Sequence, residues 1–216
     1  MEIRDRVERD GFVFLPNYMK DRSTMAVAKS FGSLMKLNSE IPIVQTLTPN
    51  MKASVKNSYS SIYGYDEFPM HTDFAHWPLP PRFLLLRAKS QCSGVKTSIV
   101  AFSELETRIE TPLFSKCVFF SRKPIMGQFI PLRICCKSRQ MYRWDREFIR
   151  PASQNSMALR DKILQHLKLL KPIDFYMKNN GDTLVVDNWK MLHGRGAVFA
   201  SERERSLDRV YLGDLW

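Results

Sequence analysis

The chain has 216 residues, of which 44% are hydrophobic and 25% are charged, as is typical of a soluble globular protein. This length fits a single domain, residues 1–216, and no apolar run approaches the roughly 20 residues that a membrane-spanning helix needs. The first ten residues are mostly charged, so we expect no secretory signal.

The net charge is +11, which attracts anions, and nucleic acid is one candidate. The basic residues are scattered, however, and no tract of five or six lysines and arginines occurs. We therefore expect a solvated basic surface around a site for small acidic or amphoteric molecules. A polyanionic partner stays as the alternative, and the charge says nothing about the oligomeric state.

The four cysteines show no CxxC spacing, and two of them are adjacent in sequence, which is unfavourable for a disulfide. We predict four reduced thiols in a cytoplasmic protein. The cysteines are Cys92, Cys117, Cys135 and Cys136.

The first half of the chain predicts one helix and several strands. Gly11 to Leu15 is typical of a buried strand, and Asp21 to Leu37 has apolar residues at helical spacing after a capping residue. A strand is possible from Ile41 to Leu47, and a strong one is predicted from Arg82 to Arg87. Further strands are predicted over 97–102, 116–120, 129–135 and 140–144.

The second half contains the clearest helix, Ser156 to Leu170, which ends before Pro172. The runs Ile173 to Met177 and Thr183 to Asp187 then flank an Asn-Asn-Gly-Asp turn, so we predict that they pair as a hairpin. A last strand is predicted from Arg209 to Leu212. Many short strands with two flanking helices indicate a mainly β fold, a double-stranded β-helix or jelly roll of the cupin type.

The sequence His71-Thr72-Asp73 is a candidate metal motif. In an extended segment residues i and i+2 point to the same face, so His71 and Asp73 can reach one ion. A third ligand must come from elsewhere, and His193 stands 120 residues after Asp73. Two imidazoles and one carboxylate can occupy one face of an octahedral ferrous ion, which leaves three positions for a bidentate co-substrate and O2.

Two histidines remain outside this motif. We interpret His166 as a surface or packing residue, because it lies on the predicted amphipathic helix. His76 is close to the metal motif, and it either packs beside Trp77 or lines a substrate pocket.

Twelve residues after His193 stands Arg205. The arginine fork binds a carboxylate through two hydrogen bonds, so Arg205 suits the distal carboxylate of an iron-chelating 2-oxo acid such as 2-oxoglutarate. Arg205, Leu207 and Arg209 share one face of the last predicted strand.

These residues resemble a known family, the taurine dioxygenase and TfdA-like oxygenases, which use Fe(II) and 2-oxoglutarate and are also described as clavaminate synthase-like. The matching segments cover nearly the whole chain, and the most specific one is C-terminal. They are 11–13, 31–32, 68–73, 80–86, 94–97, 181–189, 192–195 and 205–211.

The resemblance implies an Fe(II)/2-oxoglutarate-dependent dioxygenase with iron ligands His71, Asp73 and His193. It also implies that Arg205 and the hydroxyl of Thr97 hold the distal carboxylate of 2-oxoglutarate. Arg209 corresponds to an arginine that contacts either the primary substrate or the co-substrate. The implied reaction hydroxylates, desaturates or cyclises a small polar or amino-acid-like metabolite and releases succinate and CO2.

The sequence departs from the family pattern in three places. Lys96 is an additional residue before the threonine, so Ser98 is an alternative to Thr97. The chain is short for the family, so the lid between Thr97 and the helix at Ser156 is expected to be trimmed. The substrate pocket of the taurine enzyme is not repeated, so taurine is not implied.

Three rival interpretations remain. Arg203 and Arg209 are six residues apart, as in alkylated-nucleic-acid repair oxygenases, which suits the basic charge. A jelly roll with a dead metal site would be a binding protein. A protein hydroxylase of the JmjC type is also possible, although such enzymes usually anchor 2-oxoglutarate with lysine.

Overall fold

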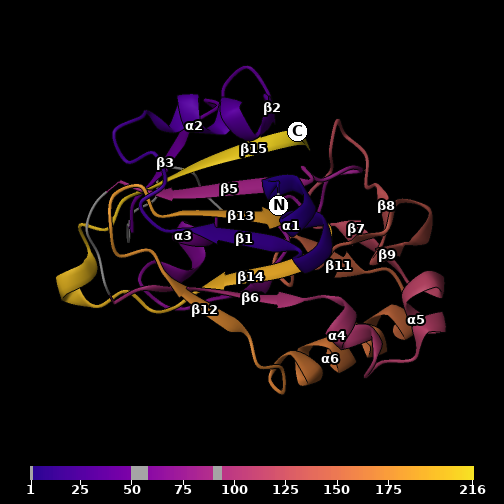
Figure 1. Cartoon of the computed structure of the whole chain (residues 1–216). Helices are drawn as coiled ribbons and strands as arrows, with labels where there is room; N and C mark the ends of the chain where they lie inside the picture. The colour runs from indigo at the N-terminus through magenta and orange to yellow at the C-terminus, as the bar shows by residue number, and fades with distance from the viewer. Residues whose placement is uncertain (1, 50–57, 90–93) are drawn as a thin grey trace.

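The computed structural model describes residues 2–49, 58–89 and 94–216, and its centre consists of two antiparallel sheets (Figure 1). The larger sheet has the order β1 (Phe12–Leu15), β13 (Thr183–Asp187), β5 (Phe83–Ala88), β15 (Leu207–Leu215) and β2 (Gly32–Leu34), and β3 (Gln45–Leu47) also pairs with β15. The smaller sheet has the order β12 (Ile173–Tyr176), β6 (Lys96–Ala101), β14 (Met191–Arg195) and β4 (Phe68–His71).

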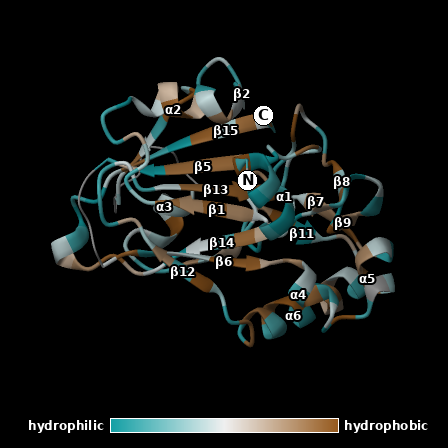
Figure 2. Cartoon of the chain, in the orientation of Figure 1, coloured by the Kyte–Doolittle hydropathy of each residue, from teal (hydrophilic) through white to brown (hydrophobic). Residues whose placement is uncertain are grey.

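The apolar run of β5 is buried on both faces because side chains alternate along a strand. Leu84 and Leu86 point between the two sheets and pack with Ile99 of β6. Phe83 and Leu85 point to the other face of the larger sheet. Figure 2 shows β5 and β6 in the brown of hydrophobic residues, which marks the interior of the sandwich.

Two helices cover the outer face of the larger sheet, α1 (Ile3–Asp10) and α2 (Thr24–Phe31). Val7 is the buried residue of the mostly charged α1, and Val27 and Phe31 bury α2 against the same apolar cluster. Ser23 caps α2 by accepting a hydrogen bond from the backbone of Ala26. This helix is shorter than predicted, because β2 begins at once after Phe31.

Residues 102–170 form a second layer at one end of the sandwich, at the lower right of Figure 1. Its helices are α4 (Ser103–Glu106), α5 (Thr111–Lys116) and α6 (Gln154–Leu167), and its strands are β7 (Val118–Ser121), β8 (Pro131–Arg133), β9 (Cys135–Cys136), β10 (Met141–Tyr142) and β11 (Ile149–Pro151). A short helix, α3 (Tyr59–Tyr63), and 3-10 turns at Lys137–Arg139 and Ala200–Glu202 complete the elements. The lid region between Thr97 and the helix at Ser156, which we expected to be short, carries its own sheet, β11-β7-β8. It also has its own core around Trp144 and Phe114.

The predicted hairpin between residues 173–177 and 183–187 is wrong. β12 pairs with β6 in the smaller sheet, whereas β13 pairs with β1 and β5 in the larger one. The turn at Gly181, which has φ 88°, therefore carries the chain from one sheet to the other. Two adjacent strands in sequence need not pair when each has a better partner in a separate layer.

The jelly roll predicted from the sequence is confirmed, since antiparallel strands from distant parts of the chain alternate between two packed sheets. The flanking helices are more numerous than the two predicted, and the strand predicted from Ile41 is limited to Gln45–Leu47. Within the described residues, no helix has the length and apolar character needed to cross a membrane. Cys117, Cys135 and Cys136 are free, while Cys92 lies outside the described residues.

Candidate active site

Strand pairing brings His71 and His193 together. They are direct partners in the antiparallel register of β4 and β14, so their side chains leave the same face of the smaller sheet. The centroids of the two rings lie 4.5 Å apart. The register shifts after this pair at Gly194, where an added Cβ would lie 2.7 Å from the carbonyl oxygen of Phe68. A side chain at this position would therefore collide with the backbone of β4, which requires glycine here.

Asp73 lies in the turn that follows β4, and its backbone is fixed by Asn188. The backbone N–H of Asp73 donates to the side-chain oxygen of Asn188 at 2.9 Å, and the amide nitrogen of Asn188 donates back to the carbonyl of Asp73 at 3.1 Å. The same amide donates to the carbonyl of Pro81 at 2.8 Å. Phe74 then adopts a left-handed φ of 55°, which is uncommon for an aromatic residue. The turn is thus held in one conformation by its buried neighbour.

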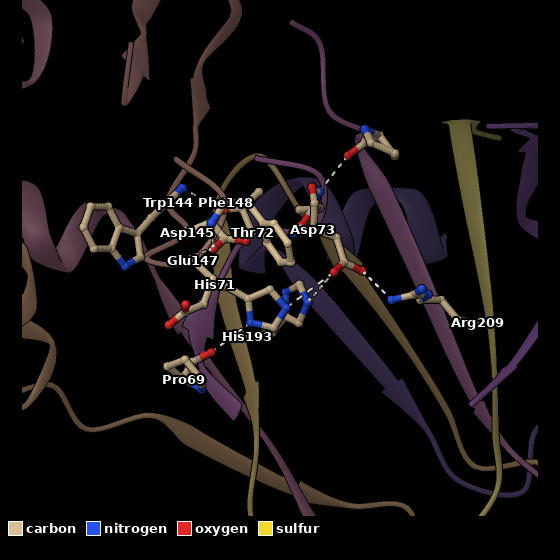
Figure 3. Close-up of polar contacts among 12 residues, drawn as sticks. Pro69, His71, Thr72, Asp73, Trp144, Asp145, Glu147, Phe148, His193 and Arg209 are labelled. Atoms are coloured by element: carbon tan, nitrogen blue, oxygen red, sulfur yellow. Dashed lines mark hydrogen bonds and ion pairs between the residues drawn. The ribbon is translucent and has the colours of Figure 1, made fainter. Parts of the chain in front are cut away.

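The three candidate ligands converge as predicted (Figure 3). The Nε2 atoms of His71 and His193 lie 3.4 Å and 3.7 Å from Oδ1 of Asp73, and all three residues are buried. Neighbouring ligands around an octahedral ion with bonds near 2.1 Å are roughly 3 Å apart, so small movements would let one ion bind all three. Two imidazoles and a carboxylate are the donor set of the facial iron site, and these residues fit such an ion.

The other carboxylate oxygen of Asp73, Oδ2, faces away from the imidazoles. It accepts a hydrogen bond from the buried hydroxyl of Tyr211 at 2.6 Å and lies 3.4 Å from Nη1 of Arg209. Burial alone would raise the pKa of Asp73, but the charge of Arg209 and the hydrogen bonds with His193 and His71 hold it well below its usual range. The carboxylate stays ionised and presents one oxygen to the metal position.

The two imidazoles differ in their hydrogen bonds and in their proton affinity. Nδ1 of His71 lies 2.8 Å from the carbonyl of Pro69, which can only accept, so Nδ1 holds the proton and Nε2 is left for a metal. Burial would lower the pKa of His71, but the hydrogen bond and charge of Asp73 raise it. Burial and the neighbouring His71 lower the pKa of His193.

Arg205 and Thr97 also lie where the sequence predicts a carboxylate clamp. The guanidinium of the buried Arg205 donates to Oγ1 of Thr97 across 3.4 Å, and both residues line the same cavity as the triad. Ser98, the alternative to Thr97, points away and donates to Asp174 of β12. Of the two hydroxyls, the one beside Arg205 is therefore that of Thr97.

The triad opens into a cavity of about 740 Å³, which is the size of a small-molecule site. The basic side of this cavity comes from Arg205 and from Arg209, which also donates to Oε1 of Gln45 at 2.8 Å. Another side comes from Tyr59 of α3 and from residues of the second layer, Asp145 among them. The cavity therefore has room for a second molecule beside an iron-chelating co-substrate.

Three further sequence predictions have clear outcomes. His76 lines the cavity with its ring 5.5 Å from that of Phe148, while its role toward a substrate stays a prediction. His166 lies on α6, at a distance from the triad, as predicted for a surface or packing residue. Arg203 stacks on the ring of Tyr65 at 4.4 Å and does not contribute to the cavity wall. The arginines that line the cavity are Arg122, Arg195, Arg205 and Arg209.

Sequence reasoning missed the residues that support the ligands. Tyr211 follows Arg209 at the next inward position of β15, so the alternation used for Arg205 and Arg209 could have found it. Asn188 lies inside the C-terminal matching segment, but the motif gives it no role. Asp145 carried no signal, because nothing in its sequence context predicts that its loop meets the metal motif.

The sequence itself matches no protein-family profile, and no curated protein is similar to it. Solved structures do match. A structure of asparagine oxygenase with Fe(II), 2S,3S-3-hydroxyasparagine and succinate has a TM-score of 0.71 at 14% identity, covering 97% of this chain and 76% of that one. PvcB, an Fe, alpha-ketoglutarate dependent oxygenase from an isonitrile synthetic pathway, gives 0.68 at 15% identity, covering 97% and 78%. One PvcB structure that matches is from Pseudomonas aeruginosa.

The non-heme iron oxygenase OrfP in complex with Fe and alpha-ketoglutaric acid gives a TM-score of 0.67 at 18% identity, covering 98% of this chain and 79% of that one. At such identities the likeness concerns the fold. The resemblance read from the motifs pointed to the same structural class. The chain has the jelly-roll fold of the iron- and 2-oxoglutarate-dependent oxygenases.

Proposed function

We propose that this protein is a non-haem Fe(II)/2-oxoglutarate-dependent dioxygenase that hydroxylates, desaturates or cyclises a small polar or amino-acid-like molecule. The convergence of His71, Asp73 and His193 within 4.8 Å of one another, on the wall of a cavity, is the observation that carries the proposal. Burying an ionised carboxylate between two imidazoles costs free energy, which argues against a binding protein whose metal site has no function.

The proposed metal ligands are Nε2 of His71, Oδ1 of Asp73 and Nε2 of His193. A ferrous ion bound there, with 2-oxoglutarate and O2, supplies the oxidation and releases succinate and CO2. Because Asp73 supplies the third protein ligand, no place is left for a chloride ligand, which favours hydroxylation or a reaction derived from it over halogenation.

Arg205 and Thr97 are the proposed binding site for the distal carboxylate of 2-oxoglutarate. Their hydrogen bond prearranges the guanidinium, and burial strengthens its attraction for an anion. Arg209 lies between this site and Asp73, at 3.4 Å from Oδ2, and its pairing with the ligand carboxylate favours a positioning role. The apolar side chains of Leu84, Leu86 and Leu207 exclude water from the same wall.

The proposal is tested by succinate formation without a primary substrate. Protein supplied with Fe(II), ascorbate and 2-oxoglutarate should release succinate slowly, and Asp73→Ala should lose most of this turnover. Asp174→Asn, which alters an exposed carboxylate on β12 outside the cavity wall, is the matched control and should keep it. Equal turnover in the Asp73 variant would remove that carboxylate from the site, and no turnover in the parent protein would refute the proposed activity.

A further inference from the structure

Asp145 is a buried carboxylate on the cavity wall that has no place in the proposed metal or 2-oxoglutarate site. It lies in the loop between β10 and β11 and is 2% exposed. Its Oδ1 accepts hydrogen bonds from the backbone N–H groups of Glu147 at 2.7 Å and Phe148 at 2.9 Å. These two bonds fix the orientation of the carboxylate in the cavity wall.

The loop of Asp145 is attached directly to the metal motif. The backbone N–H of Thr72 donates to the carbonyl of Trp144 at 2.7 Å, and the N–H of Trp144 donates back to Oγ1 of Thr72 at 3.2 Å. Asp145 consequently lies beside His71, whereas Arg209 lies on the far side of Asp73 (Figure 3). The cavity is therefore acidic at one side of the triad and basic at the other.

Asp145 forms no ion pair with a lysine or arginine of the described residues, and the opposing charge that acts on it most is that of His71 when protonated. Glu147, two residues later, pairs with Arg146 at 3.0 Å and Arg122 at 3.6 Å, and Asp73 pairs with Arg209. For Asp145, no lysine or arginine of residues 2–49, 58–89 and 94–216 forms such a pair. Burial accordingly raises the pKa of its carboxyl to about 6. A buried charge without a partner is costly, which suggests that the partner is a ligand.

Aromatic rings surround the space beside this carboxylate. The Tyr59 ring stacks on His71 with centroids 4.2 Å apart and lies 5.4 Å from Phe148, and all three rings line the cavity. The hydroxyl of Tyr59 is buried next to Asp145 and interacts with its carboxylate. Nδ1 of His76 is buried and makes no hydrogen bond within the described part of the chain. Ring faces and a carboxylate together bind cations, and Nδ1 of His76 can bond the same ligand.

We infer that Asp145 binds the cationic side-chain group of the primary substrate, an ammonium or a guanidinium, at the side of the triad remote from Arg209. This inference rests on the proposed function, and it narrows the substrate class from acidic or amphoteric molecules to those that carry a positive charge. Arg195 also lines the cavity, but its guanidinium donates to the carbonyls of Gly64 and Asp66. Arg122 and Lys123 line the cavity too; both are exposed, and Arg122 is already paired with Glu147. Arg122 and Lys123 are placed to meet the anionic end of an amphoteric molecule at the rim.

The test compares amino acids of similar shape whose side chains are charged or neutral. L-Arginine and L-citrulline, and L-lysine and N6-acetyl-L-lysine, are titrated without oxygen into protein loaded with Fe(II) and 2-oxoglutarate, with binding followed by calorimetry. At least one cationic member should bind tenfold or more tightly than its neutral partner. Asp145→Asn keeps the side-chain oxygen that the two backbone N–H groups bond, and it should weaken that cation by about ten- to a hundredfold while leaving the neutral partner unchanged.

Glu147→Gln is the matched control, because it removes a carboxylate from the same loop that does not line the cavity. It should leave the preference for the cation unchanged. The inference is overturned if no cationic probe binds more tightly than its neutral partner, or if Asp145→Asn binds both cations as the parent does. Succinate formed without substrate is measured on the same samples, so that loss of the oxygenase activity is distinguished from loss of cation binding.

Discussion

The cavity has one wall formed by β4, β14 and β15 and another formed by α3 and the loops of the second layer. The first wall places His71, His193 and Arg209 through strand pairing, in which the register fixes each side chain. The second wall places Asp145 and Tyr59 through loop contacts and a short helix. The jelly roll thus holds the chemistry on paired strands, while the part that faces the substrate lies on segments that can vary without altering the sheets.

The largest effect should come from removing a ligand on the strand wall. We expect His193→Ala to lower the affinity for Fe(II) by more than a hundredfold, because one of three protein ligands is lost. Removing a residue that only hydrogen-bonds to a metal ligand typically costs about 10–100-fold. Iron content after anaerobic gel filtration measures the effect. His166→Ala, on the surface of α6, should bind iron like the parent, and iron retained by the His193 variant would break the assignment.

The next effect should come from the carboxylate clamp. Arg205→Lys replaces a two-pronged donor with one ammonium, so the concentration of 2-oxoglutarate for half-maximal succinate formation should rise about tenfold or more. Arg209→Lys should change it less, because Arg209 contacts Asp73 and Gln45. An unchanged half-saturation in the Arg205 variant would place the clamp elsewhere on this wall.

The contrast between the walls explains what the sequence could predict. The residues of the strand wall could be predicted because side chains alternate between the two faces of a strand. This alternation places both residues of the HxD motif on one face, and likewise Arg205 and Arg209. Residues 173–177 and 183–187 were misassigned because sequence adjacency favours a hairpin, while sheet membership depends on partners far along the chain. Asp145 could not be predicted, since its approach to His71 depends on the contact between Thr72 and Trp144.

A smaller effect is expected at the support of the ligand carboxylate. Tyr211→Phe removes the hydroxyl that bonds Oδ2 of Asp73 and keeps the buried ring. Fe(II) should bind about tenfold more weakly, whereas the half-saturation for 2-oxoglutarate should stay the same, because Arg205 is untouched. Iron titration and succinate kinetics on one preparation separate the two quantities. A change in the 2-oxoglutarate requirement alone would contradict the support role.

The smallest effect concerns the loop wall and pH. Burial raises the pKa of Asp145 from 3.8 to about 6, so between these values the folded protein holds a proton that the unfolded chain releases. The parent should therefore lose stability as pH rises through this range, and Asp145→Asn should not. Relative to Asp145→Asn, the parent should lose about 2 kcal/mol of its free energy of unfolding between about pH 4 and about pH 7.

Urea unfolding of the metal-free proteins at several pH values measures this difference. If the difference in the free energy of unfolding stayed constant across this pH range, the pKa of Asp145 would not be raised in the folded protein. The strand pairing that places His71 and His193 does not depend on that result, since the register of β4 and β14 is set by their own backbones.

The central claim is that His71, Asp73 and His193 bind one ferrous ion on which 2-oxoglutarate is chelated. Its most direct test is an anaerobic titration of the protein with Fe(II) and 2-oxoglutarate, followed by the visible charge-transfer absorption of the iron–2-oxo acid chelate. The account predicts that this absorption saturates at one iron per chain and is absent from Asp73→Ala. Saturation at the same level in that variant, or no absorption in the parent protein, would contradict it.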